Sequence, residues 1–313
     1  MQSKAAMTRV LVIGEINVDL ILGGCEKFPS YGTEVLARDG FLTLGSASAI
    51  TAVGLARLGT PVSFLGKVGA DPNGAVCLNA MESAGVDVTR VERSKNVQTG
   101  ITVSIVGSDD RALVTFPGSI TALKGADVPD SLLEQFGHLH VSSYFLQSNL
   151  TPALPNIFQR AQTLGLTVSV DPGFDPAEEW DAGLLEALVY VDLFFPNEME
   201  LSGLTSMLTP GEAVRTLDNG RTIIVAKLGR SGCLVRNDGV SIAAPAIEVS
   251  PVDSTGAGDS FNAGFLNAWL EGEPIRECMR SGNICGGLAT RRAGGTPGQP
   301  DRSELNAALK AKK

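Results

Sequence analysis

Short apolar runs recur along the chain and are separated by stretches with helical spacing. The first run, RVLVIG at 9–14, is almost continuous, which is typical of a strand buried on both faces of a sheet. Further runs are VSFLGKVG, HLHVSS, LTVSVD, DLFFPN and TIIVAKLG, and the helical stretches lie at 51–59, 74–85, about 152–164 and about 181–189. Strands that alternate with helices predict an α/β fold, with a mostly parallel sheet and helices on both of its faces.

Two stretches depart from this pattern and predict a second, smaller sheet. Residues 98–116, QTGITVSIVGSDDRALVTF, alternate β-branched and polar side chains around a GSDD turn, which indicates a β-hairpin. Residues 28–45, FPSYGTEVLARDGFLTLG, are rich in β-forming residues and glycine. Since no linker, low-complexity tract or repeat divides the sequence, we predict a single domain over 1–313 with a β lid formed by about 20–43 and 98–117.

The charge, the N-terminal residues and the cysteines indicate which binding partners and which cellular location to expect. The net charge is −9 and no basic stretch occurs, which argues against nucleic acid, although glycine-loop amides can hold an anionic small ligand. The N-terminal MQSKAAMTR lacks the apolar core of a signal peptide, and Glu15, Asn17 and Asp19 interrupt the apolar run that follows. We therefore expect a cytoplasmic protein without a membrane partner. The five cysteines form no C-x-x-C pair, so we expect buried free thiols.

The stretch DSTGAGDSFNAGFL at 253–266 is a candidate site for phosphate chemistry. It places Gly256, Ala257 and Gly258 directly before Asp259 and a helical run. The first amides of a helix lack intrahelical partners, and glycines let a phosphate approach them. A carboxylate next to a bound phosphate repels it, so Asp259 does not fit a site that only binds an anion. It fits a site in which the carboxylate accepts the proton of an attacking hydroxyl while the amides stabilise the transferring phosphoryl group.

A simpler interpretation stays open at this point. Asp259 could be only the N-cap of the helix, with the glycines serving to turn the chain. The sequence also contains no G-x-x-x-x-G-K-[ST] loop, so a bound ATP would be held without a P-loop lysine.

The same stretch resembles the C-terminal signature of the PfkB, or ribokinase-like, family of carbohydrate kinases, D-T-x-G-A-G-D-x-F before a helix. The resemblance implies that Asp259 is the catalytic base and that Gly256, Ala257 and Gly258 form an anion hole for the γ-phosphate of ATP, with Mg²⁺ as cofactor. It covers almost the whole chain, because other family segments follow in the expected order: GEINVDLIL, FPSYGTEV, TAVGLARLG, FLGKVGADPNG, PNEMEL, KLGRSG and SGNICGG.

The N-terminal segments carry the implied acceptor site. By resemblance, Asn17 and Asp19 reach the hydroxyls of a sugar, and Gly45 and Ser46 stand where the family has two adjacent glycines beside it. A structural hydrogen-bonding role is the alternative for two polar residues that share one face of a strand.

The later segments carry the implied nucleotide site. In PNEMEL, Asn197 and Glu200 match a family motif that is associated with magnesium and phosphate binding. Their spacing is equally that of a helix capping box. KLGRSG places Gly229 and Gly232 near ATP, with Lys227 as a candidate phosphate contact. Alternatively, Gly229 and Gly232 form a simple hairpin turn, and Lys227 is a solvated residue at the end of a strand.

Further residues are implied at the edges of this site. SGNICGG places Asn283 beside the adenine pocket, and Asp253 with Thr255 match residues that hold potassium in many family members. The second potassium loop, TRRAGGTPGQP at 290–300, fits less closely, which leaves monovalent-cation activation open. For Asp171, which follows a strand, we favour a place in the cleft over a role in turning the loop.

His138 and His140 alternate with apolar residues on a predicted strand. Since no carboxylate or cysteine pattern accompanies them, we do not expect them to bind a metal.

The chain departs from the family pattern at Ile50, which stands where a sugar-binding asparagine is usual. Isoleucine neither donates nor accepts a side-chain hydrogen bond, and a buried hydroxyl without its partner costs about 1–3 kcal/mol. We therefore expect an acceptor with less polar surface at this point, or one bound through Ser46 or Ser48.

The resulting hypothesis is an ATP-dependent kinase that phosphorylates a hydroxymethyl group of a sugar or sugar-like molecule under a closing lid. In the family such lids often form a dimer contact, and exposed sheet edges favour a homodimer here as well. A nucleoside kinase on the same scaffold is the nearest alternative, and a non-catalytic sugar- or nucleotide-binding regulator is a more distant one.

Overall fold

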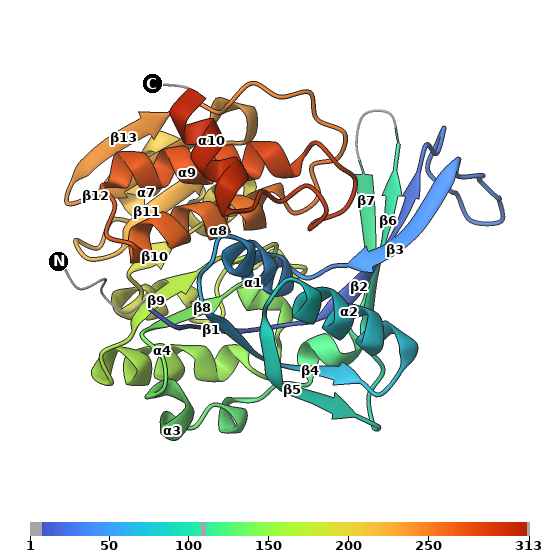
Figure 1. The fold of residues 1–313 in the computed structure, drawn as a ribbon, viewed down its shortest axis with the longest axis horizontal. Helices are drawn as coiled ribbons and strands as arrows, with labels where there is room; N and C mark the ends of the chain where they lie inside the picture. The colour runs from blue at the N-terminus through green and yellow to red at the C-terminus, as the bar shows by residue number, and fades with distance from the viewer. Residues whose placement is uncertain (1–7, 108–110, 312–313) are drawn as a thin grey trace.

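A nine-stranded sheet forms the centre of the fold in the computed structural model, which describes residues 8–107 and 111–311 (Figure 1). From one edge to the other its strands are β13 (Val240–Ala244), β12 (Cys233–Asn237), β11 (Ile223–Lys227), β10 (Leu193–Phe194), β9 (Thr167–Val170), β8 (His138–Val141), β1 (Val10–Ile13), β4 (Val62–Gly69) and β5 (Asp87–Ser94). Only the β11–β12 and β12–β13 pairs are antiparallel, so the mostly parallel sheet that the sequence predicts is confirmed.

Helices cover both faces of this sheet, and two large apolar clusters lie between them and the strands. One face carries α1 (Ala47–Arg57), α2 (Pro72–Ser83), α8 (Ala257–Leu270) and α9 (Ile275–Ala289). The other face carries α3 (Asp130–Leu133), α4 (Leu154–Thr163), α5 (Leu184–Ala187), α6 (Glu198–Thr205) and α7 (Pro210–Thr216). α10 (Arg302–Ala311) packs on α9. Short 3₁₀ turns lie at Gly118–Thr121, Gly125–Asp127, Tyr144–Leu146, Thr151–Ala153, Leu188–Tyr190 and Gly229–Ser231.

Neighbouring residues of β1 contribute to different clusters, as expected for a strand covered on both sides. Val10 and Val12 face the cluster under α1 and α8, and Leu11 and Ile13 face the cluster under α4. The continuous apolar run at 9–14 is therefore explained by burial on both faces. In the described part of the chain, no helix combines the length and the apolar character that crossing a membrane requires.

A second sheet of four strands projects from the body and confirms the predicted small sheet (Figure 1). Its strands, in order, are β3 (Asp39–Leu44), β2 (Asn17–Gly23), β6 (Gly100–Val106) and β7 (Arg111–Phe116). β6 and β7 form the expected antiparallel hairpin, while residues 108–110 of its GSDD turn lie outside the described residues. We call this sheet the lid.

The two faces of the lid differ in chemistry. Strand register places polar residues in one cross-strand row, Thr43, Asp19, Thr102 and Thr115, and apolar residues in the next, Leu42, Leu20, Val103 and Val114. Because successive side chains point to opposite faces, the polar row lies on the inner face, which also carries Ile21, Ser104 and Leu113, and the apolar row lies on the outer face. The inner face is the one that borders the site described below.

Candidate active site

The carboxyl ends of the central strands meet the lid at a cavity of about 200 Å³. Loops after β1 and β8, the start of α1, the inner face of the lid and the first turn of α8 form its walls. The lining residues are Glu15, Asn17, Asp19, Ser46, Ala47, Ile50, Thr102, Ser104, Leu113, Thr115, Ile120, Ser143, Leu146, Thr255, Gly256 and Asp259. Open parallel sheets bind their ligands at this edge. The predicted base, Asp259, lines the cavity together with the predicted acceptor residues Asn17, Asp19 and Ser46, whereas Gly45 is not among the lining residues.

The glycine turn leads directly into α8, a helix of 14 residues. Gly256 is the N-cap and has φ 72°, a left-handed conformation that glycine adopts without strain. A Cβ at this position would lie 2.6 Å from the Cα of Gly295, so the loop at 290–300 packs directly on the glycine turn. Since the cap is Gly256 and Asp259 lies in the first helical turn, the alternative in which Asp259 is the N-cap is wrong.

Asp259 is half-buried and lines the cavity. Its carbonyl oxygen accepts a hydrogen bond of 3.4 Å from the Thr51 hydroxyl, which links α8 to α1. Burial raises the pKa of Asp259 well above its usual value, and the negative charge of Asp171 raises it further, while Lys227 opposes the shift. The site therefore makes this carboxylate a stronger base than an exposed aspartate.

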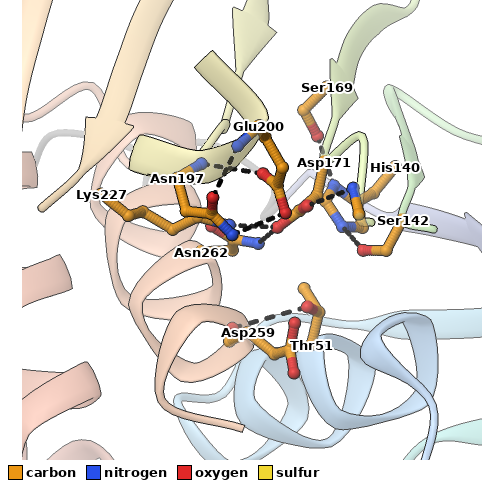
Figure 2. A network of polar contacts seen from close by, with 11 residues as sticks. Thr51, His140, Ser142, Ser169, Asp171, Asn197, Glu200, Lys227, Asp259 and Asn262 are labelled. Atoms are coloured by element: carbon orange, nitrogen blue, oxygen red, sulfur yellow. Dashed lines mark hydrogen bonds and ion pairs between the residues drawn. The ribbon is translucent and has the colours of Figure 1, made fainter. Parts of the chain in front are cut away.

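A buried ion pair lies at the ends of β9 and β11, and Figure 2 shows it above Asp259. The Lys227 ammonium pairs with Asp171, and the amide of Asn262 from α8 donates to the same Asp171 oxygen at 2.5 Å. Burial lowers the pKa of Lys227, but the charges of Asp171 and Glu200 outweigh it, so the pKa is raised and the lysine stays charged. Its side chain is 12% exposed, so the solvated strand end considered above is wrong.

Lys227 also lies beside the glycine turn. A Cβ built on Gly258 would stand 3.6 Å from its Nζ atom. A positive charge thus reaches the N-terminus of α8, where backbone amides already favour an anion. Asp171, which we expected in the cleft, holds this lysine in place.

Asn197 and Glu200 form the capping box that their spacing allows. The Asn197 side chain accepts from the Glu200 amide at 2.9 Å, and the Glu200 carboxylate accepts from the Asn197 amide at 2.8 Å and from its side chain at 2.7 Å. Burial raises the pKa of Glu200 to about 7. Figure 2 shows both residues next to Lys227.

On the lid side of the cavity, Asn17 and Asp19 contact each other along β2. The Asn17 amide donates to Asp19 at 3.0 Å and to the Thr102 hydroxyl at 3.2 Å. A Cβ on Gly45 would overlap the Asp19 carboxylate and lie 2.7 Å from the Asn17 amide nitrogen. Glycine is therefore required at position 45, for close approach of the two side chains.

Glu15 is a site residue that we did not predict. It is 3% exposed, and its carboxylate accepts from the Ser46 hydroxyl at 3.0 Å, the Ser48 hydroxyl at 2.5 Å and the Ser48 amide at 3.2 Å. Burial raises its pKa, and the Ser48 hydroxyl opposes that shift. The signal in the sequence is its spacing, because Glu15, Asn17 and Asp19 occupy alternate positions before and along β2.

Ser46, a predicted acceptor residue, supports Glu15. It has φ 71°, caps α1 by accepting from the Ala49 amide at 3.0 Å, and its hydroxyl lies 2.6 Å from the Glu15 carbonyl oxygen. The positive φ at position 46 is a conformation that favours glycine. A serine is suited to this position because its hydroxyl caps α1 and contacts Glu15. Ile50 stands four residues further along α1, is 3% exposed, and adds an apolar side chain to the cavity wall.

The predicted nucleotide-binding turn joins β11 to β12. Gly229 and Gly232 both have positive φ, and a Cβ on Gly232 would overlap the Ala244 carbonyl oxygen. The Asn283 amide donates to the Pro245 carbonyl at 3.0 Å, so this residue fixes the loop after β13. A second cavity of about 380 Å³ lies between that loop, α9 and α10.

Asp253 joins the two loops of the predicted potassium site. One of its oxygens accepts from the Thr255 amide at 2.9 Å and hydroxyl at 2.8 Å, and the other accepts from the Gly294 amide at 2.8 Å. No group of three or more His, Cys, Asp and Glu side chains that could hold a metal ion occurs among the described residues.

The two buried histidines bind hydroxyl groups. His138 contacts Thr167 and Ser169 at 2.7 Å, and His140 contacts Ser169 at 2.7 Å and Ser142 at 2.8 Å. Burial lowers the pKa of His140 to about 4, so both contacts are those of a neutral ring. All five cysteines are buried and free.

A covered parallel sheet with a glycine turn, an acid at the next helix and a β lid over a small cavity is the arrangement of a small-molecule kinase. The chain matches the profile of the pfkB family carbohydrate kinases over residues 7–302 and belongs to that family. It is a carbohydrate kinase, and its fold is ribokinase-like.

Its relatives act on different acceptors. The chain is 32% identical to an ATP-dependent ribose-1-phosphate kinase of Halopiger xanaduensis, over 92% of this chain and 94% of the relative. It is 27% identical to a nucleoside kinase of Methanothermobacter thermautotrophicus, over 94% and 93% of the two chains. The structure of an Arabidopsis thaliana ribokinase complexed with ribose and ATP matches with a TM-score of 0.84 and 26% identity, over 97% and 99% of the two chains.

Proposed function

We propose that this protein transfers the γ-phosphate of ATP to a hydroxymethyl group of a sugar or sugar-like molecule bound in the lid cavity. The observation that carries the proposal is the position of Asp259. This half-buried carboxylate lies in the first turn of α8 and on the wall of the cavity that Asn17 and Asp19 also line. In this position, Asp259 shares a cavity with the acceptor that would bind there, and it adjoins the backbone amides of the glycine turn.

In this proposal, Asp259 accepts the proton of the acceptor hydroxyl as that oxygen attacks phosphorus. A general base works best when its pKa is close to the working pH, and the raised pKa of Asp259 moves it in that direction. Asn17 and Asp19 would orient the acceptor through its other hydroxyls, with Gly45 and Ser46 completing this wall.

The turn formed by Gly256, Ala257 and Gly258 would hold the transferring phosphoryl group at the positive end of α8. The amide of Ala257 also donates to the Ser254 carbonyl at 3.2 Å, so it is partly engaged within the turn. The Lys227 ammonium would add a positive charge on the donor side of this group.

Bound Mg²⁺ would neutralise charge on the phosphate oxygens of ATP. The described residues fit a magnesium ion held through phosphates and water better than one held in a protein cage, because they contain no cluster of metal-ligating side chains. Asn197 and Glu200 would act on it indirectly, through water, with the carboxylate of Glu200 kept close to Lys227.

The rest of ATP would lie along the β11–β12 turn, with Gly229 and Gly232 under the phosphates. Asn283 would border the adenine through the loop that it holds. A monovalent cation at Asp253 and Thr255 stays a prediction, which a comparison of rates in potassium and tetramethylammonium chloride would test.

A nucleoside is the second candidate acceptor. Ile50, Ile120, Leu113 and Leu146 line the cavity and would pack against a base, which a free sugar lacks.

We also propose that the protein forms a homodimer through the outer face of the lid. Leu42, Val114 and Phe116 on this face are 44%, 63% and 49% exposed, which is unusual for large apolar residues that lie together on one sheet. A second copy of the same face is the partner that would cover them.

The direct test of the proposed function is ADP release with Mg·ATP against a panel of sugars, polyols and nucleosides, with mass spectrometry of the products. We expect ADP release that depends on one class of acceptor, and a product that is heavier by one phosphoryl group. Acceptor binding without any phosphorylated product would contradict the proposal and favour a binding protein.

A further inference from the structure

Ile50 contacts a second part of the site besides the cavity. Its side chain is 3% exposed and lines the cavity near the start of α1. A Cβ built on Gly295, in the loop at 290–300, would overlap the Cδ1 atom of Ile50 and lie 2.9 Å from its Cγ1 atom. The Ile50 side chain therefore fills the space beside Gly295 and packs directly on the backbone of this loop.

Gly295 in turn packs on the glycine turn. A Cβ on Gly256 would lie 2.6 Å from the Cα of Gly295 and 2.7 Å from its carbonyl oxygen. Gly295 thus contacts the Ile50 side chain and also the N-cap of α8. The contacts form a continuous series, Ile50–Gly295–Gly256, from the wall of the cavity to the turn that leads into α8.

Hydrogen bonds hold the loop on both sides of Gly295. The Gln299 side chain donates to the Ile50 carbonyl at 2.9 Å and to the Ser260 hydroxyl, in the first turn of α8, at 3.0 Å. On the other side, the Gly294 amide donates to Asp253 at 2.8 Å. Since Gly295 lies between these two attachments and has no side chain, its position depends on what packs against it.

The glycine turn has few side chains with which to hold its own amides in place. Gly256 and Gly258 carry none, and a glycine backbone has more conformational freedom than that of other residues. Ile50 has the opposite properties, because a β-branched side chain in a helix strongly prefers one χ1 rotamer. A stiff residue of α1 therefore supports a flexible turn through one intervening glycine.

We propose that Ile50 is a positioning residue for phosphoryl transfer, which acts through Gly295 to hold the glycine turn where its amides meet the transferring phosphoryl group. A small displacement of such a group costs much of its stabilising effect, so the loss of Ile50 lowers kcat. This inference rests on the proposed function, since it assigns a further residue to the same site.

An exchange of volume between the two positions tests the contact. Ile50→Ala removes the atoms beside Gly295, and Gly295→Ala adds a Cβ in the space that Ile50 fills in the wild type. The φ of Gly295 is not positive, so alanine suits its backbone. The double variant therefore refills part of the space without the overlap.

Steady-state kinetics of the full chain, well below its melting temperature, would compare the wild type, both single variants and the double variant. The substrates are Mg·ATP and the acceptor that the panel above identifies. We expect kcat to fall about 10-fold or more in each single variant. In the double variant we expect kcat to be at least about threefold higher than in either single variant, because the two positions are in contact.

Ile50→Val is a milder variant that removes only the Cδ1 atom and keeps the β-branch, and it should lower kcat in the same direction but less. Val53→Ala is the matched control on the same helix. Val53 is also 3% exposed but is not among the described residues that line the cavity. We expect this control to lower the melting temperature and to leave kcat unchanged.

Two results would overturn the inference while the proposed function stands. One is a change of the acceptor KM alone in the Ile50 variants, which would make Ile50 only a wall of the acceptor cavity. The other is a double variant whose kcat is the product of two independent losses. A wild type that phosphorylates no acceptor would instead contradict the proposed function, and the inference with it.

Discussion

At the residue scale, Gly45 leaves the space in which Asp19 and Asn17 meet. A Cβ there would overlap the Asp19 carboxylate, so Gly45→Ala must displace that side chain. We expect the KM of the acceptor to rise about 10-fold or more, as for the loss of one charge-assisted hydrogen bond, with the KM of ATP unchanged.

Gly211→Ala in α7 is the matched control, because a Cβ there would meet only the end of the Arg215 side chain at 3.7 Å. Steady-state kinetics with both substrates varied would separate the two sites. An effect of Gly45→Ala on ATP alone would contradict the placement of the acceptor.

The raised pKa of Asp259 predicts the pH dependence of the reaction. The base is lost when it is protonated, so kcat/KM for the acceptor falls as the pH decreases through this raised pKa, above the usual aspartate value of about 3.9. Asp171→Asn removes a negative charge that raises the pKa, so its acid limb should lie at lower pH.

Asp87→Asn, on β5 at the edge of the sheet, is the control and should leave the pH profile unchanged. A shift of the Asp171→Asn profile to higher pH would show that another group controls the acid limb.

Single residues also show how far the sequence leads. The position of Asp259 at the start of a helix was predictable because its glycine turn and helix are adjacent in the chain. Glu15 was not, because its role depends on Ser46 and Ser48, about 30 residues away, and on a fold that buries all three. The ion pair of Lys227 joins residues 56 positions apart, a contact that no local pattern encodes.

At the scale of elements, the ion pair between Lys227 and Asp171 ties the end of β11 to the end of β9. Both side chains are largely buried, at 12% and 5% exposure. Lys227→Met leaves Asp171 and Glu200 without their cation, and we expect the free energy of unfolding to fall by about 3–5 kcal/mol. Chemical denaturation at neutral pH would measure this change.

The double variant Lys227→Met with Asp171→Asn should recover part of that loss, since it removes the uncompensated charge as well. Glu271→Gln, in the more exposed pair with Arg302, should cost at most about 1 kcal/mol. A cost for Lys227→Met no larger than for this control would contradict a buried, structural ion pair.

The elements themselves were largely predictable. A strand buried on both faces has a continuous apolar run, and such runs identified the strands of the main sheet. A strand buried on one face alternates apolar and polar residues, and this alternation identified the hairpin of β6 and β7. The same pattern could not show that β2 leaves the main sheet. Only Glu15 and Asn17, which interrupt the apolar run after β1, mark the place where the chain passes to the lid.

At the scale of the whole molecule, the lid turns the row of Asp19, Thr102 and Thr115 toward the cavity and an apolar face outward. If the outer face joins two copies, sedimentation should give a dimer, and Val114→Lys should give a monomer, because a buried unpaired charge is costly. Lys95→Glu, near β5, would serve as a surface control. A monomeric wild-type protein would contradict this contact.

The central claim is that Asp259 is the base of a phosphoryl transfer from ATP. The most direct test compares Asp259→Asn with the wild type on an accepted substrate, by product formation and thermal melting. We predict a fall in kcat of about 10³-fold or more with ATP still bound. Because the folded-state pKa of Asp259 is raised, its ionised form destabilises the protein at neutral pH, so the melting temperature of the variant should be unchanged or higher. Turnover close to wild type in this variant would contradict the account.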